Sequence, residues 1–157
     1  MHSQIFLARH GQTAWSISGQ HTGRADIPLT NQGERNARSL GARLKGLSFV
    51  KVLTSPLQRA KRTCELAGFG TVATVDPDLM EWNYGQYEGK RTVEIRQERP
   101  DWNLFREGWP AAETLAAVSA RADGPERAGI RSLDFYQPPQ GLCGQVSRWF
   151  RYLWSIL

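Results

Sequence analysis

Short apolar runs alternate with amphipathic stretches over the first half of the chain. The runs with the length and composition of buried strands are 4–8, 50–54 and 71–75. After Thr30, apolar residues recur at spacings of three and four up to residue 47, which predicts a helix with one apolar face. A second stripe from Leu57 to Ala67 predicts another helix that starts at Ser55–Pro56. Strands that alternate with helices predict an α/β protein, whose parallel sheet is covered on both faces and bears its site at the carboxyl ends of the strands.

The pattern changes along the second half of the chain. Shorter amphipathic segments predict helices at 92–98, 101–107 and 113–121. From Gly124 onward glycines and prolines interrupt the sequence, and only a poor strand candidate at 133–136 and an apolar helix at 146–157 are predicted. We therefore expect one globular domain over 1–122 and an atypical tail over 123–157. A shifted reading frame or degenerate gene copy would explain this tail, and so would a real divergent variant.

Composition narrows the class of protein. A chain of 157 residues with 40% hydrophobic residues suits one core. The 20 Lys and Arg residues exceed the 15 Asp and Glu residues, and most are arginines, whose rigid guanidinium fits phosphate oxygens. Because the basic residues are scattered and no nucleic-acid-binding motif is present, a phosphorylated small molecule is the expected partner and a nucleic acid the weaker alternative. No apolar run suits a membrane span or a secretory signal, so we expect a cytoplasmic protein without membrane contact.

The candidate chemistry lies directly after the first predicted strand. Arg9, His10 and Gly11 place a guanidinium, an imidazole and a flexible turn at one point. A neutral imidazole nitrogen can attack phosphorus while an arginine neutralises the phosphate oxygens. A lone triplet of this kind is more often a surface histidine beside an arginine, so the interpretation depends on its context. No metal site is expected, because Cys64 and Cys143 lie far apart and outside any Cys/His cluster.

Four ordered segments supply that context. They are Arg9 to Trp15 (RHGQTAW), Thr22 to Thr30 (TGRADIPLT), Ser55 to Ala60 (SPLQRA, followed by Thr63) and Glu81 to Gly89 (EWNYGQYEG). In this order they resemble the nucleophile, substrate-loop, second-arginine and general-acid motifs of the histidine phosphatase superfamily, also called phosphoglycerate-mutase-like. The resemblance covers residues 4–122. It implies a three-layer α/β/α sandwich with a mostly parallel sheet.

The resemblance also implies roles for individual residues. It makes His10 the nucleophile that becomes phosphohistidine and Glu81 the proton donor to the leaving group. Arg9 and Arg59 become phosphate-binding residues, and charge-assisted hydrogen bonds of this kind contribute roughly 1.5 to 3 kcal/mol each. The remaining substrate-binding candidates are Gln12, Ser16, Gln20, Thr22, Gly23 and Glu113. His21 lies inside the substrate loop and is expected at the rim of the site rather than as a second base.

The segments 15–23, 81–89 and 99–103 are more similar to the sugar-bisphosphatase branch, in particular to sedoheptulose-1,7-bisphosphatase, than to the mutases. The predicted function is hydrolysis of a small phosphomonoester of carbohydrate metabolism, a phosphosugar, through a phosphohistidine and without metal or cofactor. Two alternatives stay open. One is a phosphoglycerate-mutase-like phosphotransferase, and the other is a non-catalytic phosphate-binding remnant.

The chain departs from the family pattern in two places. Its histidines are His2, His10 and His21, so the second catalytic histidine, which in the family follows a late core strand in a His-Gly motif, is missing. Ala111-Ala112 stand where the family has Gly-Gly before the acidic residue Glu113. We therefore expect a sheet without a late core strand and an activity that is reduced or lost. The sequence leaves the exact substrate and the oligomeric state open.

Overall fold

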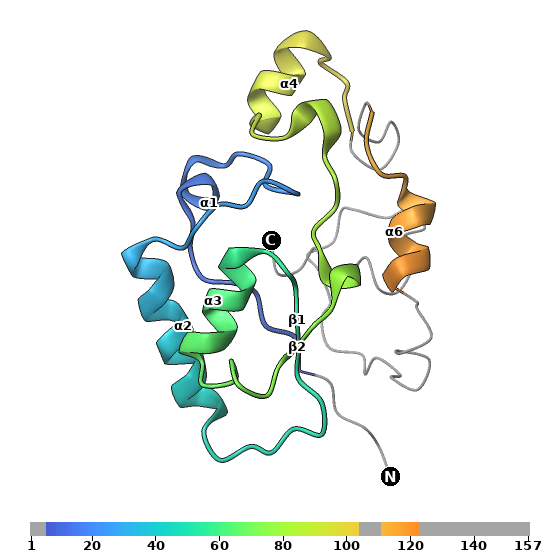
Figure 1. The fold of residues 1–157 in the computed structure, drawn as a ribbon. Helices are drawn as coiled ribbons and strands as arrows, with labels where there is room; N and C mark the ends of the chain where they lie inside the picture. Colours follow the sequence, from blue (N-terminus) through green and yellow to red (C-terminus); the bar gives the residue numbers. More distant parts are fainter. Residues whose placement is uncertain (1–5, 104–110, 123–157) are drawn as a thin grey trace, which may run out of the picture. The chain divides into compact units, whose positions relative to one another are not determined.

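A computed structural model of the chain describes residues 6–103 and 111–122 (Figure 1). The chain divides into two units, of which the larger comprises residues 10–114 and the smaller comprises residues 1–9 and 115–157. Helix α6 (Leu115–Ala122) belongs to the smaller unit, and all the other described helices and both strands belong to the larger one. The candidate site residues, except Arg9, therefore all lie in the larger unit. The predictions for 124–157 lie outside the described residues.

Helix α2 (Asn31–Leu44) confirms the helix predicted after Thr30. Thr30 begins it as expected, because its Oγ1 accepts a hydrogen bond of 3.0 Å from the backbone N–H of Gly33. The helix buries Gly33 and Ala37, which lie one turn apart on its inner face. It ends at Leu44, and Leu47, expected to extend the apolar stripe, lies beyond it and is exposed.

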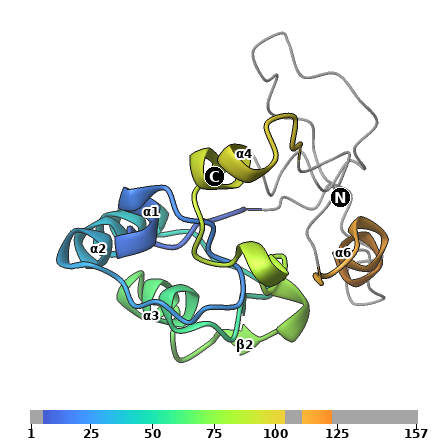
Figure 2. The same ribbon diagram turned by 90° about the horizontal axis from the view of Figure 1, so that it is seen from above.

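Helix α3 (Gln58–Leu66) begins two residues later than the proline predicts. Leu57 is extended, with φ −68° and ψ 137°, and it precedes the first helical residue. The cap comes from a distant residue, because the backbone N–H of Gln58 donates to the Asp26 carboxylate at 2.7 Å. A carboxylate at a helix N-terminus also interacts favourably with the helix dipole. Helix α3 packs along α2, as both ribbon views show (Figures 1 and 2).

The described sheet consists of two parallel strands, β1 (Leu53–Thr54) and β2 (Thr74–Val75). Leu53 is paired with Thr74 and Thr54 with Val75. Both strands lie inside the predicted runs 50–54 and 71–75 and confirm a parallel α/β arrangement, but they are shorter. Exposure explains the difference, since the side chains of Val50 and Val72 lie in solvent rather than against a covering layer.

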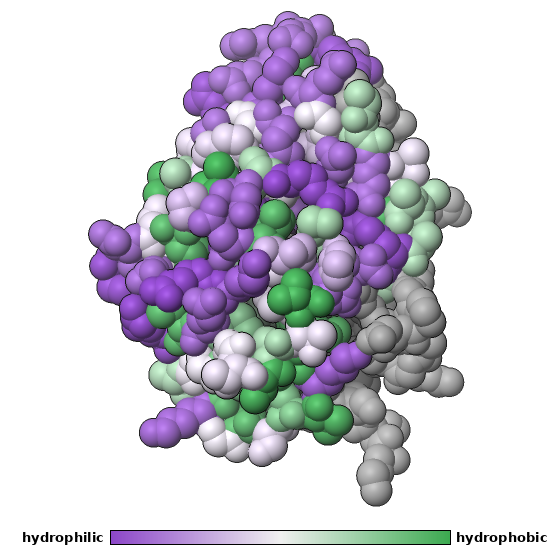
Figure 3. All heavy atoms as spheres, in the orientation of Figure 1, coloured by the Kyte–Doolittle hydropathy of each residue, from purple (hydrophilic) through white to green (hydrophobic). Residues whose placement is uncertain are grey.

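The predicted first strand is absent from the described part of its segment. Residues 6–8 have no strand assignment, and residues 4 and 5 lie outside the described ranges. The side chains of Phe6 and Leu7 are about half exposed, at 51% and 52%, so the apolar run is not buried as a core strand would be. Figure 3 shows exposed apolar side chains toward the lower end of the molecule, whereas the surface around α4 (Thr92–Glu98) is hydrophilic.

Five short helical segments complete the described structure. Helix α4 has the bounds predicted for 92–98, and α6 begins two residues later than the predicted 113–121. Helix α1 (Ala14–Ser18) and the 3-10 helices η1 (Pro77–Leu79) and η2 (Gly85–Tyr87) lie in segments for which the sequence predicts no helix. The helix predicted at 101–107 is not formed over 101–103, and its remainder lies outside the described residues. No helix in the described ranges is long and apolar enough to cross a membrane.

Two glycines bring the loop after His10 against the first turn of α2. A Cβ added to Gly11 would meet the carbonyl oxygen of Gly33 at 2.2 Å, and one added to Gly33 would meet the carbonyl oxygen of Gln12 at 2.1 Å. No carbon atom can approach a backbone oxygen this closely. The backbones at these two positions are therefore in direct contact only because both residues lack a side chain.

We expect Gly33→Ala to destabilise the protein although alanine favours helices. The overlap with the Gln12 carbonyl forces the loop away from α2, at a cost of roughly 1 to 3 kcal/mol as for other overpacked positions. The free energy of unfolding in urea measures the effect. Ser39→Ala, at an exposed position of the same helix, is the control and should change it little. Equal stability of the two variants would contradict the close contact.

Candidate active site

The imidazole of His10 is held by the backbone of the following residue. Its Nδ1 lies 2.7 Å from the carbonyl oxygen of Gly11. Because a carbonyl oxygen only accepts, Nδ1 must be the nitrogen that donates the hydrogen. In the neutral ring the other nitrogen, Nε2, then bears the lone pair. The geometry thus selects the tautomer in which Nε2 can act as a nucleophile or base.

Thr63 connects the His10 loop to helix α3. The backbone N–H of Gly11 donates to Thr63 Oγ1 at 2.9 Å, and this hydroxyl donates to the carbonyl oxygen of Arg59 at 2.7 Å. Both bonds are buried, so they form in a low dielectric and hold the loop firmly. The side chain of Thr63 therefore bridges the backbone of Gly11, next to His10, and the backbone of Arg59.

Arg59 is the buried cation of the site, with 2% of its surface exposed. Its Nη1 donates to the carbonyl oxygen of Ala25 at 2.8 Å, and its Nη2 to those of Gly23 at 2.9 Å and Thr22 at 3.4 Å. Burial lowers the pKa of this guanidinium, and the negative charge of Glu81 is the largest opposing effect. An arginine retains its charge under these conditions, so a permanent positive charge lies inside the larger unit.

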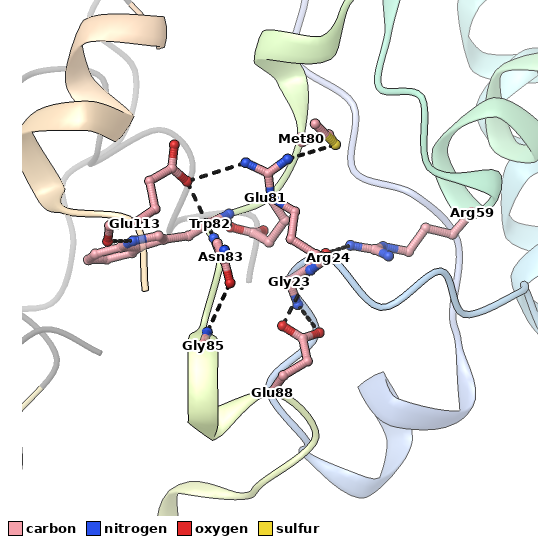
Figure 4. A network of polar contacts seen from close by, with 10 residues as sticks. All are labelled: Gly23, Arg24, Arg59, Met80, Glu81, Trp82, Asn83, Gly85, Glu88 and Glu113. Carbon is pink, nitrogen blue, oxygen red and sulfur yellow. Dashed lines mark hydrogen bonds and ion pairs between the residues drawn. The ribbon is translucent and has the colours of Figure 1, made fainter. Parts of the chain in front are cut away.

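The segment 22–25 is held from two sides. While its carbonyl oxygens accept hydrogen bonds from Arg59, its backbone N–H groups point at the Glu88 carboxylate (Figure 4). Glu88 accepts from the N–H groups of Gly23 at 2.7 Å, Ala25 at 3.1 Å and Arg24 at 3.3 Å. Several N–H groups that converge on one carboxylate form an anion-binding turn. A buried cation and a carboxylate thus fix this turn between them.

Glu81 and Glu113 lie in the same region of the larger unit. The Glu81 carboxylate accepts from the backbone N–H of Trp82 at 2.8 Å, and its charge acts on Arg59. Trp82 Nε1 donates to the backbone oxygen of Glu113 at 2.6 Å, which links the segment 81–84 to the acidic residue of the 111–114 segment. The structure therefore brings Arg59, Glu81 and Glu113 around the turn at 22–25, and their roles toward a substrate stay predictions.

The side chains of the other predicted substrate-binding residues form hydrogen bonds within the protein. Ser16 caps helix α1, since its hydroxyl accepts from the Thr13 backbone N–H at 2.9 Å and donates to the Thr13 carbonyl oxygen at 2.8 Å. Gln12 Oε1 accepts from Thr30 Oγ1 at 2.9 Å, and Gln20 Nε2 donates to the backbone oxygen of residue 89 at 2.8 Å. Thr22 Oγ1 donates to the backbone oxygen of Gln20 at 3.1 Å. These side chains hold the loops of the site in place, and their contact with a substrate stays a prediction.

Arg9 belongs to the smaller unit, and its side chain is exposed. Its predicted role as a phosphate-binding arginine beside the nucleophile therefore also stays a prediction. Among the described residues, no group of three or more His, Cys, Asp and Glu side chains could hold a metal ion.

The sequence assigned no role to Glu88, which lies inside the segment 81–89, or to Thr63, which follows the segment 55–60. Thr63 had a detectable signal, because it follows Arg59 by four residues and would share its helix face. Glu88 had none, since a glutamate in a loop rich in polar and aromatic residues gives no sign that it accepts three backbone hydrogen bonds from a turn far away in the chain. Its role appears only when the tertiary structure places residues 23–25 against it.

His21 lies in an aromatic environment at the edge of this region. Its ring makes edge contacts with Tyr84 and Trp102, with ring centroids 5.5 and 6.2 Å away, and its Nε2 is 3.1 Å from Thr92 Oγ1. Burial lowers the pKa of His21 below its ordinary value of 6.5, and the charge of Glu88 only partly opposes this effect. The neutral ring is thus the form that the folded state favours, and the expectation that His21 lies at the rim rather than acting as a second base stays a prediction.

We expect Glu88→Gln to loosen the turn at 22–25. The amide nitrogen of glutamine cannot accept from a backbone N–H, and the charge is lost, so the unfolding free energy should fall by roughly 1 to 3 kcal/mol. Amide hydrogen exchange at residues 23–25 should become faster. Glu98→Gln is the matched control, because the Glu98 side chain is 63% exposed and forms a surface ion pair with Lys90. Unchanged exchange in Glu88→Gln would refute the role of Glu88.

We expect His21 to make the protein less stable below neutral pH. Because its folded-state pKa lies below 6.5, the unfolded chain binds the proton more readily, so stability falls as the pH drops from about 6.5 toward the lowered value. Unfolding in urea at pH 7.5 and at pH 5.5 measures this loss for the wild type and for His21→Gln. The variant should lose less stability over this interval. An equal or larger loss in the variant would contradict the assignment.

Comparison with known proteins agrees with this geometry. The chain is 43% identical to an acid phosphatase of Mycobacterium tuberculosis over an alignment of 122 residues. This alignment covers 76% of this chain and 60% of the relative. It is 37% identical to sedoheptulose 1,7-bisphosphatase of Saccharomyces cerevisiae, over 75% of this chain and 52% of the relative. A probable phosphoglycerate mutase GpmB of Cronobacter sakazakii is 34% identical, over 77% of this chain and 60% of the relative. The chain thus spans about half to three-fifths of the length of these relatives.

Solved structures and a family profile complete the comparison. The structure of the open reading frame Rv3214 from Mycobacterium tuberculosis superposes with a TM-score of 0.67 and 44% identity, over 73% of this chain and 60% of that one. The profile of the histidine phosphatase superfamily (branch 1) matches residues 5–126. The α/β structure with its parallel strands, the segments around His10 and Arg59 and this match agree, and the chain belongs to branch 1 of the histidine phosphatase superfamily.

Proposed function

We propose that the protein hydrolyses a small phosphomonoester, a phosphosugar, through phosphorylation of His10. The observation that supports this most directly is the orientation of the imidazole. Nδ1 donates to the Gly11 carbonyl oxygen, which leaves Nε2 unprotonated in the neutral ring. The same loop is bonded through Thr63 to the helix of Arg59, so the nucleophile has a buried guanidinium on the neighbouring element.

The reaction has two steps. His10 Nε2 attacks the phosphorus atom, the N–P bond forms and the P–O bond to the sugar breaks, while Glu81 donates a proton to the leaving oxygen. In the second step a water molecule attacks the phosphohistidine and releases inorganic phosphate, and Glu81 takes up a proton from that water. Arg59 and Arg9 neutralise the phosphate oxygens, which is the electrostatic part of the catalysis.

Further parts of this proposal concern the whole domain. Residues 1–122 would form the histidine phosphatase-like domain as a three-layer α/β/α sandwich that lacks a late core strand, and residues 123–157 an atypical tail. A chain without the second catalytic histidine would react more slowly, because one positioned acid–base group contributes roughly 100-fold to 10,000-fold to a rate.

A phosphoglycerate-mutase-like transfer is the second candidate. The probable phosphoglycerate mutase among the relatives supports it, since the same phosphohistidine can pass its phosphoryl group to a sugar acid instead of water. A non-catalytic phosphate-binding remnant, as the missing histidine suggests, would bind phosphate without any turnover.

His10→Ala should abolish covalent labelling by a phosphorylated substrate. Incubation of the full chain with a radiolabelled phosphosugar, followed by rapid quenching, should give an acid-labile, base-stable phosphate in the wild type. His21→Gln, which also removes one imidazole, should retain the label. Hydrolysis without a label, or a label that persists in His10→Ala, would refute the mechanism. Release of inorganic phosphate distinguishes hydrolysis from isomerisation of 3-phosphoglycerate, and phosphate binding alone would favour the remnant.

A further inference from the structure

The backbone of Arg24 is fixed, while its side chain is not firmly bound. Its own N–H donates to Glu88, and the carbonyl oxygens of the residues on both sides, Gly23 and Ala25, accept from Arg59. The buried Arg59 and the half-buried Glu88 therefore fix the position of the Arg24 Cα atom. Only the side-chain torsions remain free, so the guanidinium can change partners without any movement of the turn.

The guanidinium of Arg24 has poor hydrogen-bond acceptors. Its Nη2 lies 3.6 Å from the Glu113 carboxylate, beyond hydrogen-bond distance. Its Nη1 donates to the thioether sulfur of Met80 at 2.9 Å, and sulfur is a weak acceptor. Its Nε is buried and has no acceptor among the described residues. A group with five donors in a rigid fork thus has no oxygen at bonding distance in the contacts of this region (Figure 4).

Glu113 is a partner that can release the guanidinium. Its side chain is 14% exposed and that of Arg24 is 35% exposed, so solvent reaches the cation more easily than the carboxylate. The same carboxylate oxygen of Glu113 also lies 3.4 Å from the backbone N–H of Asn83, so Glu113 retains a donor when Arg24 turns away. An exchange of partners therefore leaves no buried charge without a contact.

We propose that Arg24 is a specificity-determining residue that binds a second anionic group of the substrate, and that Glu113 holds its guanidinium until that group arrives. This inference rests on the proposed function and adds the substrate class, a phosphomonoester with a further carboxylate or phosphate. The oxygens of that group replace the sulfur atom and the distant carboxylate as acceptors and reach the unpaired Nε. Arg59 stays bonded to the backbone of the turn, so its charge acts on the phosphoryl group without leaving the turn, whereas Arg24 contacts the second anionic group directly.

Two matched pairs of substrates test the proposal with the full chain. Glycerol 3-phosphate and 3-phosphoglycerate differ by a hydroxymethyl group in place of a carboxylate, and fructose 1-phosphate and fructose 1,6-bisphosphate differ by one phosphate. For each pair the ratio of kcat/KM for the doubly anionic compound to that for its partner measures the contribution of the second group. The pair that responds identifies whether a carboxylate or a phosphate is bound.

Arg24→Gln should lower this ratio by about tenfold to hundredfold in at least one pair, as expected for the loss of a charge-assisted contact. Arg24→Lys should retain part of it, since the charge remains and the fork is lost. Glu113→Gln should raise the ratio, because the competing carboxylate is gone. Arg38→Gln, which removes an exposed arginine from an ion pair with Glu34 on α2, is the matched control and should leave the ratio unchanged.

An equal loss for both members of each pair would overturn the proposal, because Arg24 would then support the turn rather than bind an anion. The same holds for a wild type that binds neither doubly anionic compound better than its partner. Calorimetric Kd values for the four compounds give the same ratios without turnover. A protein that binds them selectively through Arg24 but hydrolyses none would refute the phosphatase activity and support the role of Arg24.

Discussion

The turn at 22–25 depends on two opposite charges that bind its backbone from two sides. Arg59 donates to its carbonyl oxygens and Glu88 accepts from its N–H groups, so the peptide units are oriented between a cation and an anion. Each charge satisfies backbone groups that a turn without regular structure would otherwise leave to water. The two residues come from helix α3 and from the loop after η2, and the turn therefore holds these two parts of the larger unit together. Removal of Arg59 leaves the carbonyl oxygens of the turn without their donor, and removal of Glu88 leaves its N–H groups without their acceptor.

The backbone of Arg59 also connects the turn to the His10 loop. Thr63 accepts from the backbone of Gly11 and donates to the backbone of Arg59, one helical turn before it, so the loop and the arginine share one rigid element. The direct contact of Gly11 and Gly33 places α2 behind this loop. The His10 loop is thus fixed by short contacts of the backbone and of Thr63, and the turn by the charged side chains of Arg59 and Glu88, which is the kind of arrangement that a preorganised site requires.

Features that depend on local sequence were the ones that could be predicted. The Thr30 cap, the bounds of α4 and the order α2, β1, α3, β2 follow from capping residues and periodicity, and the structure confirms them. The late start of α3 could not be predicted, because its cap is the distant carboxylate of Asp26. The function of Glu88 was missed for the same reason. The motifs indicated which segments form the site, but the bonds between segments depend on the tertiary structure, and no periodicity in the sequence encodes them.

Arg24 and Arg59 differ in how well the hydrogen-bond donors of each guanidinium are satisfied within the protein. Arg59 is buried and donates to two backbone oxygens at 2.8 and 2.9 Å and to a third at 3.4 Å, so it acts as part of the scaffold, and its charge is present before any ligand binds. Arg24 is partly exposed and has a sulfur atom and a distant carboxylate as partners. A cation that already has good acceptors gains little from a ligand, because each new bond replaces an old one of similar strength. A cation with poor acceptors gains most of the new bond, so ligand selectivity in this region should depend on Arg24 more than on the better bound Arg59.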